Sequence, residues 1–398
     1  DAPAIRFKGF SDAWEQRKLG ELVDRVVRKN TNNESTLPLT ISAQYGLVDQ
    51  ITYFNNRVAS RDVSNYYLVL NGEFAYNKST SDGYPFGAVK RLDLYEKGVL
   101  STLYIVFAPK KEQQIDSDYL TVFFDTDRWH KGVAERAAEG ARNHGLLNIS
   151  AEDFFDIDLS VPKDIVEQKH IGAFIRQLDN LITLHQRKFE KLTNVKKSML
   201  EKMFPQNGSS YPEIRFKGFT DPWEQRKFEE IAVRSSVICS DDTLPRVEYE
   251  DIVSGTGRLN KDIYAKQSIK SGIAFHQGDV LYGKLRPYLQ NWLLPTFDGL
   301  AVGDFWVLQP QNADSSFLYR LIQSRQFDEV ANQSTGTKMP RADWKLVSKT
   351  VFSIPSNISE QAAIGTYFTA LDSLITLHQR ELEKLQNIKK SMLEKMFV

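Results

Sequence analysis

The stretch IRFKGFSDAWEQRK occupies residues 5–18, and residues 214–227 read IRFKGFTDPWEQRK. These stretches agree at 12 of 14 positions, at an offset of 209 residues. A second pair, residues 167–204 and 360–397, begins with Glu-Gln, ends with KKSMLEKMF and agrees at 26 of 38 positions, at an offset of 193. Because repeated blocks in a fixed order mark duplicated structural units, the sequence predicts two copies of one unit.

The segments between these blocks have diverged, but a faint correspondence remains. NGEFAYNK (71–78) resembles QGDVLYGK (277–284), GVLSTLYIVFAP (98–109) resembles GLAVGDFWVLQP (299–310), and EGARNHG (139–145) lies where TGTKMP (335–340) lies. The offset between matching positions decreases steadily along the chain. This is the pattern of one fold whose loops differ in length.

The C-terminal block of each unit is predicted to be a long helix. Asp164 and Asn357 are suitable N-caps, and Glu167 and Glu360 follow at the spacing of a capping box. Apolar residues then recur in steps of three and four, as in a coiled-coil seam. Because only a short linker joins the units, we expect the two helices to run antiparallel and the chain termini to meet.

Each middle segment predicts a domain of mixed sheet and helix. Strands are expected at 66–70, 73–77, 86–92 and 99–107, with counterparts at 279–285 and 300–309; one helix is expected at 117–138 and at 315–333, and one late strand at 155–161 and at 349–354. Trp14 and Trp223 occupy matching flank positions. We expect both to pack their domain onto the helices.

The predicted fold class is mixed α/β, with two similar α/β domains joined by two long antiparallel coiled-coil-like helices and an internal pseudo-two-fold repeat. The expected divisions are a first domain at 1–163, a spacer helix at 164–204, a linker at 205–213, a second domain at 214–356 and a second spacer helix at 357–398.

Composition narrows the function classes. The 398 residues include 51 Lys plus Arg and 51 Asp plus Glu, so the net charge is zero and any nucleic-acid site must be a local patch. The single cysteine, Cys239, cannot form an intrachain disulfide, which suits a reducing cytoplasm. No apolar run approaches the roughly 18 residues that span a bilayer, so no membrane partner is expected.

Motifs for catalysis are missing from the sequence. It contains no dinucleotide-binding, phosphate-loop, zinc-protease, nucleophile-elbow or paired CxxC motif, and its six histidines lack metal-ligand spacing. We therefore predict no catalytic residue and no metal site. The acidic pairs are better explained as loop, cap or strand-edge residues than as a nuclease site.

Polar loops with basic residues lie at matching places in both units, although their sequences differ. Any one of them alone would be explained as an ordinary solvated loop. Together they are typical of one scaffold that reads two targets through phosphate and base contacts. The candidate contacts are Lys78, Ser79, Thr80, Arg142, Asn143 and His144 in the first domain, and Lys284, Arg286, Tyr288, Thr337, Lys338 and Arg341 in the second.

The whole chain resembles the specificity subunit of type I restriction–modification systems. The resemblance rests on the doubled FKGF-x-D-x-WEQRK flank, on the doubled EQ-x-x-IG…LITLHQR…KKSMLEKMF helix, and on LYGKLRPYL (281–289) followed by STGTKMPR (334–341). The first domain departs from the last two motifs, since it has AYNKSTSDG and EGARNHG in their place.

This resemblance implies a subunit without catalytic activity that reads a bipartite, asymmetric site on double-stranded DNA. It implies two methyltransferase subunits that bring S-adenosylmethionine, restriction and translocase subunits that use ATP and Mg, and no cofactor in this chain. Two alternatives stay open: an assembly scaffold built on a coiled coil that does not bind DNA, and a nuclease or methyltransferase with an unrecognised site. The divergence of the two middles favours DNA reading.

Overall fold

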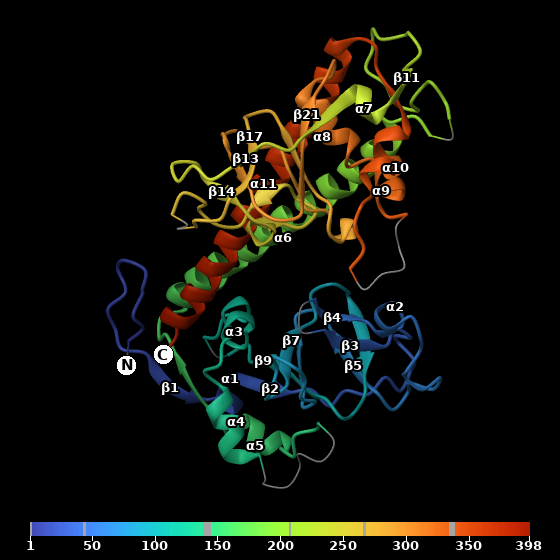
Figure 1. Cartoon of the computed structure of the whole chain (residues 1–398). Coiled ribbons are helices and arrows are strands. Elements are labelled where there is room, and N and C mark those ends of the chain that lie inside the picture. Colours follow the sequence, from blue (N-terminus) through green and yellow to red (C-terminus); the bar gives the residue numbers. More distant parts are fainter. Residues whose placement is uncertain are drawn as a thin grey trace. The chain divides into compact units, whose positions relative to one another are not determined.

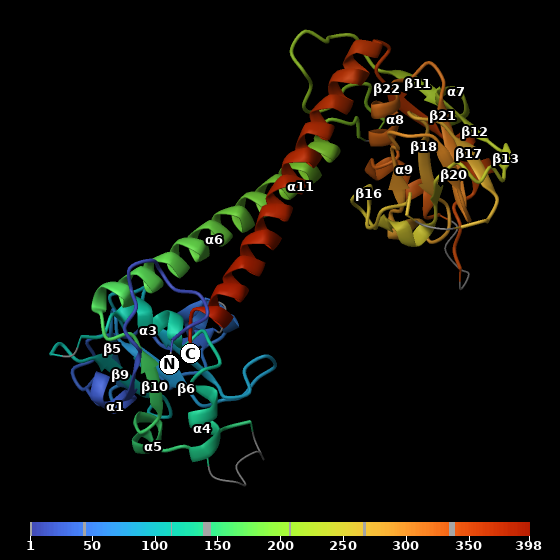
Figure 2. The same ribbon diagram turned by 90° about the vertical axis from the view of Figure 1, so that its left-hand side faces the viewer.

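The computed structural model describes residues 2–42, 45–112, 114–137, 145–206, 208–265, 268–333 and 339–398. The chain divides into two units (Figures 1 and 2). Unit 1 comprises Asp1–His185 and Glu381–Val398, and unit 2 comprises Gln186–Arg380. Each unit therefore contains part of both long helices.

Unit 1 is a mixed α/β domain with short elements. They are β1 (Glu15–Lys18), α1 (Leu19–Leu22), β2 (Val23–Arg25), β3 (Leu39–Ser42), β4 (Gly46–Asp49), α2 (Gln50–Phe54), β5 (Tyr67–Leu70), β6 (Phe74–Asn77), β7 (Ala88–Arg91), β8 (Lys97–Leu100), β9 (Ile105–Pro109), α3 (Ser117–Phe123), α4 (His130–Arg136), α5 (Ala151–Phe155), β10 (Asp158–Val161) and the start of α6 (Ile165–Lys202).

Unit 2 repeats this order with small variations. Its elements are β11 (Glu224–Lys227), α7 (Phe228–Ile231), β12 (Ala232–Ser235), β13 (Ile238–Cys239), β14 (Arg246–Val247), η2 (Tyr249–Asp251), β15 (Ile252–Val253), β16 (Arg258–Leu259), β17 (Gly272–Phe275), β18 (Val280–Gly283), η3 (Pro287–Leu289), β19 (Trp292–Leu293), β20 (Gly299–Ala301), β21 (Phe305–Pro310), α8 (Ser315–Leu321), α9 (Arg325–Ala331), α10 (Trp344–Lys349), β22 (Val351–Ile354) and the start of α11 (Ile358–Lys395).

The main sheet and the flank pair have the same topology in both units, whereas the smaller sheets differ. The four-stranded order β2-β9-β6-β7 of unit 1 corresponds to β12-β21-β18-β19 of unit 2, and the flank pair β1-β10 corresponds to β11-β22. All these pairings are antiparallel. The faint sequence correspondence is therefore structural, because β6 and β18 lie in NGEFAYNK and QGDVLYGK, and β9 and β21 lie in the second matched pair of stretches.

Two predictions of local structure were wrong. The single strand expected at 99–107 is two strands, β8 and β9, because a turn at 101–104 separates them, and 300–309 is likewise divided between β20 and β21. The helix expected after these strands is a pair of short helices, α3 with α4 and α8 with α9. Asp116 caps α3 through the backbone N–H of Tyr119, and Ser324 caps α9 through that of Phe327.

The long helices begin at the predicted caps. Asp164 accepts a hydrogen bond from the backbone N–H of Val166, and Asn357 accepts one from that of Ser359. The capping-box role of the following glutamates was wrong. Glu167 instead binds the guanidinium of Arg6 through two hydrogen bonds, of 2.6 and 2.8 Å.

The repeated Glu-Gln-x-x-Ile-Gly motif joins helix, flank and domain. Gln168 accepts from the backbone N–H of Asp116 at 2.8 Å and donates to the carbonyl of Pro162 at 2.8 Å. Gly172 lets α6 approach α3, since a Cβ there would lie 2.8 Å from the backbone nitrogen of Tyr119. In unit 2, Glu360, Gln361 and Gly365 of α11 make the equivalent contacts.

Within each unit the two helix segments are joined by an equivalent ion pair. Asp179 of α6 binds Lys389 of α11 at 2.7 Å in unit 1, and Lys196 of α6 binds Asp372 of α11 at 2.6 Å in unit 2. The partner in α11 moves backward as the position in α6 advances, so the segments run antiparallel. Asp372 is the repeat of Asp179 and Lys389 that of Lys196, which makes the pairing pseudo-symmetric.

The predicted meeting of the termini is confirmed. The backbone N–H of Ile5 donates to the carbonyl of Lys395 at 2.9 Å, and that of Ile214 donates to Lys202 at 2.9 Å, at the repeated positions. The N and C labels lie side by side in both views (Figures 1 and 2). Trp14 packs edge-on against Tyr119 and Phe397 within the unit 1 core, as its predicted role requires.

Candidate nucleic-acid interface

Two loops of unit 2 that are distant in sequence meet beyond the end of β18. Leu285 forms an antiparallel bridge with Arg341. The backbone N–H of Arg286 donates to Pro340 at 2.8 Å, and that of Ala342 donates to Lys284 at 2.8 Å. Together these contacts bring Lys284, Arg286, Tyr288 and Arg341, four of the predicted contacts, into one loop pair.

Asp304, in the turn before β21, binds two cations of this loop pair. Its carboxylate lies 3.5 Å from the Lys284 ammonium and 3.1 Å from the Arg341 guanidinium. Partial burial would raise the pKa of Asp304, but Arg341 and Lys284 outweigh this effect and hold the pKa below its usual value. The carboxylate therefore stays charged and orients both cations.

The hydroxyl of Tyr249 fixes the backbone beneath these cations. It accepts from the backbone N–H of Leu285 at 2.7 Å and donates to the carbonyl of Asp304 at 3.0 Å. Burial raises the pKa of Tyr249, so the hydroxyl keeps the proton that it donates. The loop pair is thus held by these partly buried hydrogen bonds as well as by the ion pairs of Asp304.

Arg286 and Tyr288 project from this supported loop. Both are exposed, and Tyr288 retains 56% of its accessible surface. Arg286 has a φ of 49°, a left-handed backbone conformation that is uncommon for residues other than glycine. Its guanidinium has no ion pair or hydrogen bond with any residue that the structure describes, so it is available to a ligand.

Unit 1 brings together the corresponding loops. Ser79 forms a bridge with Leu146, and the backbone N–H of Thr80 donates to Gly145 at 2.6 Å. The ammonium of Lys78 donates to the carbonyl of Ile149 at 3.2 Å, while Ser79 is exposed. Both units therefore present a loop pair at the same place on the same sheet, with different side chains.

Five of the predicted contacts lie outside the described residues: Arg142, Asn143, His144, Thr337 and Lys338. Asp304 and Tyr249 were missed by sequence reasoning. Aligning 299–310 with 98–109 would have drawn attention to Asp304, because the matching residue of unit 1, Leu103, carries no charge.

Other kinds of site find no support in the described parts of the chain. No three His, Cys, Asp or Glu side chains there are gathered so that they could hold a metal ion. None of the helices described is both long and apolar enough to cross a membrane.

Each α/β unit thus has the same main sheet, a segment of each long helix and a pair of polar loops at equivalent positions. The model of the type I restriction modification DNA specificity domain matches residues 12–194 and again residues 222–387. The chain belongs to this family, and it serves as a DNA-recognition subunit that also has a scaffold role.

Known relatives resemble the chain over nearly its full length. The type I restriction enzyme MjaVIII specificity subunit of Methanocaldococcus jannaschii is 22% identical over 96% of this chain and 91% of that protein. The EcoDI specificity subunit of Escherichia coli is 22% identical over 96% of this chain and 88% of that protein. The fold is similar to the crystal structure of an S subunit from M. genitalium, with a TM-score of 0.63 at 12% identity over 100% of this chain and 99% of that chain.

Proposed function

We propose that this chain reads a bipartite, asymmetric sequence on double-stranded DNA, one half with each unit, and has no catalytic activity of its own. The observation that carries the proposal is the matched loop pair on equivalent sheets, with an exposed Arg286 in unit 2 and an exposed Ser79 in unit 1. Because the supports are alike and the side chains differ, the two half-sites differ in sequence. A scaffold that only bound proteins would not need two units with different loop side chains.

The shared parts of the two units bind two copies of one methyltransferase subunit. The sequence LITLHQR occurs in both long helices, and it leaves leucines exposed at the same repeated positions. Leu181 and Leu184 of α6 are 43% and 45% exposed, and Leu374 and Leu377 of α11 are 44% and 51% exposed. Apolar side chains three residues apart on an exposed helix face suit docking by a partner helix.

The remaining chemistry then lies in the partners. The methyltransferase subunits bring S-adenosylmethionine, and restriction and translocase subunits bring ATP and Mg. The complex works in the cytoplasm, where it meets DNA.

Replacing Arg286 with alanine is expected to weaken specific binding by the assembled complex. A base contact should cost about 1–3 kcal/mol and relax the preference at one position of one half-site, whereas a phosphate contact should lower the salt slope by about 1. Binding isotherms at several salt concentrations separate the two cases. Lys349→Ala, which removes an exposed cation bound to Glu229, is the control and should leave specificity unchanged. If Arg286→Ala leaves affinity and specificity unchanged, this loop does not belong to the DNA interface.

Replacing Asp304 with asparagine is expected to strengthen non-specific binding to DNA. The change keeps the shape of the side chain but removes the charge that restrains Lys284 and Arg341. With this carboxylate neutral, the two cations are restrained less strongly, which should tighten binding to unrelated DNA and steepen its salt dependence, while discrimination between sequences falls. Competition between specific and unrelated duplexes measures both effects. A loss of affinity for every sequence would mean that Asp304 does not act by restraining these cations.

A further inference from the structure

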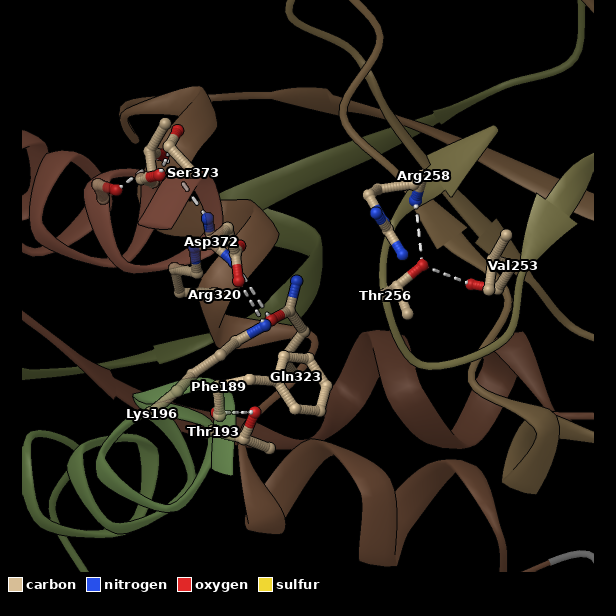
Figure 3. Close-up of polar contacts among 12 residues, drawn as sticks. Phe189, Thr193, Lys196, Val253, Thr256, Arg258, Arg320, Gln323, Asp372 and Ser373 are labelled. Carbon is tan, nitrogen blue, oxygen red and sulfur yellow. Dashed lines mark hydrogen bonds and ion pairs between the residues drawn. The ribbon is translucent and has the colours of Figure 1, made fainter. Parts of the chain in front are cut away.

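A cleft of about 630 Å³ lies in unit 2, and its lining includes Gln290, two residues after Tyr288. Its walls come from the α6 and α11 segments of this unit, from the turn between β15 and β16, and from α8 and α9. Trp292, Tyr319 and Leu294 supply apolar surface, and Lys196, Asp372 and Gln323 gather at one end. Figure 3 shows this polar end, with Thr256 and Arg258 of the turn on the opposite side.

Two cations share one carboxylate at this polar end. The Lys196 ammonium lies 2.6 Å from one oxygen of Asp372, and the Arg320 guanidinium lies 2.8 Å from the other. The side chains of Lys196 and Arg320 are only 16% and 3% exposed. Lys196, Arg320 and Asp372 together carry a net charge of +1. Because little water reaches them, this charge is poorly screened.

Unit 1 provides the internal comparison, because its equivalent cluster is balanced. Lys389 binds Asp179 at 2.7 Å and Asp125 at 3.6 Å, and Asp125 also binds Lys90 at 2.6 Å. Two cations therefore meet two carboxylates. Asp125 lies two residues after α3, and the residue two positions after α8 is the uncharged Gln323. The same framework thus lacks one negative charge in unit 2.

Hydrogen-bond donors at the same place are also left without acceptors. The Nε of Arg320, buried behind the lining, has no hydrogen-bond partner among the described residues. The amide nitrogen of Gln323 has none of good geometry there, although this side chain lies beside the Tyr319 hydroxyl. A buried donor without an acceptor is costly and rare, and it commonly marks a missing ligand or ion. An anion in the cleft would supply the missing negative charge and an acceptor for the Gln323 amide.

Other charged residues of the lining include two further cations and two further carboxylates. Arg258 donates to the neutral Gln379 at 2.8 Å, and Lys197 is exposed on α6, so neither is neutralised by these contacts. Asp328 and Glu201 also line the cleft. Burial raises the pKa of Asp328 above its usual value.

We propose that this cleft binds the phosphate or carboxylate group of a small organic molecule. The anionic group lies at Gln323 and Lys196, with the buried Arg320 behind them, and the apolar part of the molecule lies against Trp292 and Leu294. The volume suits such a ligand, because small-molecule sites commonly measure about 300–1,000 Å³. The chain's role in DNA recognition does not depend on this proposal.

Calorimetric titration of the full-length chain at low ionic strength tests the proposal with inorganic phosphate, AMP and succinate. At least one of these should bind in a 1:1 ratio with a Kd below about 1 mM. Gln323→Asp, which gives unit 2 the carboxylate of unit 1, should weaken binding at least tenfold and raise the Tm of the free protein. Gln311→Asp adds the same charge outside the cleft lining and should change the Kd less than twofold.

Three results would overturn the assignment. One is the absence of saturable binding by all three anions. Another is equal weakening by Gln323→Asp and Gln311→Asp, which would indicate a general charge effect. The third is displacement of a bound anion by unrelated duplex DNA, which would show that the cleft binds the DNA backbone. None of these results would alter the expectations for Arg286.

Discussion

Replacing Glu360 with alanine is expected to lower the free energy of unfolding by about 3 kcal/mol. The Glu360 side chain is 2% exposed and accepts two hydrogen bonds from Arg215, of 2.7 and 2.8 Å. It also accepts one from the indole of Trp223 at 3.3 Å. Its loss leaves a guanidinium that is only 15% exposed without a counter-charge and a buried indole without an acceptor.

Urea denaturation of the full chain measures this loss, and the first unit supplies the matched control. Glu167 binds Arg6 in the same way, but the indole nitrogen of Trp14 has no hydrogen-bond partner among the described residues. Glu167→Ala should therefore cost about 1 kcal/mol less than Glu360→Ala. A loss below about 1 kcal/mol in Glu360→Ala would show that the clamp between flank and helix does not stabilise the unit.

A chain that ends at residue 213 is expected to form a homodimer that reads a palindrome. Unit 1 takes Met396 and Phe397, which follow α11, into its core and binds Lys389 of α11 to Asp179. The half-chain lacks those residues, but 196–204 has the same sequence, KKSMLEKMF, as 389–397. A second copy can therefore supply the missing segment, and two identical readers related by a two-fold axis match a symmetric site.

Light scattering of the half-chain and mapping of the sites modified by the half-chain with its methyltransferase partner test this expectation. The control chain ends at residue 195, before KKSMLEKMF, and should neither dimerise nor fold. A folded monomer from the 213-residue chain, or a modified site without two-fold symmetry, would refute the pseudo-two-fold account.

The repeat predicted the architecture because it is a global signal. Two copies of each block defined both long helices, their caps at Asp164 and Asn357, and the meeting of the termini. Divergent middles with matching segments indicated that β6 and β18 are equivalent. These inferences compare one part of the chain with another and need no knowledge of distant contacts.

Predictions from local sequence were wrong where a residue distant in the sequence determines the structure. Glu167 has the spacing of a capping box, but Arg6, 161 residues away in the sequence, binds it instead. The turn at 101–104 divides a stretch that has continuous strand-like composition. Helix propensity over 117–138 likewise gave no sign that α3 ends at Phe123.

The candidate interface was predicted only in part, for the same reason. Basic residues on loops pointed to Lys284, Arg286 and Arg341, and the structure brings them together. Asp304 and Tyr249, which hold the loop pair, come from other segments and have no motif of their own. Their role depends on the antiparallel pairing of β18 with β21, which places Gly283 opposite Phe305.

Selection of bound sequences from random duplex DNA, with the full chain assembled with its methyltransferase partner, tests the central claim most directly. The account predicts two short specified segments of different sequence, separated by unspecified base pairs. A single continuous specified segment, two identical half-sites or no sequence preference would contradict it.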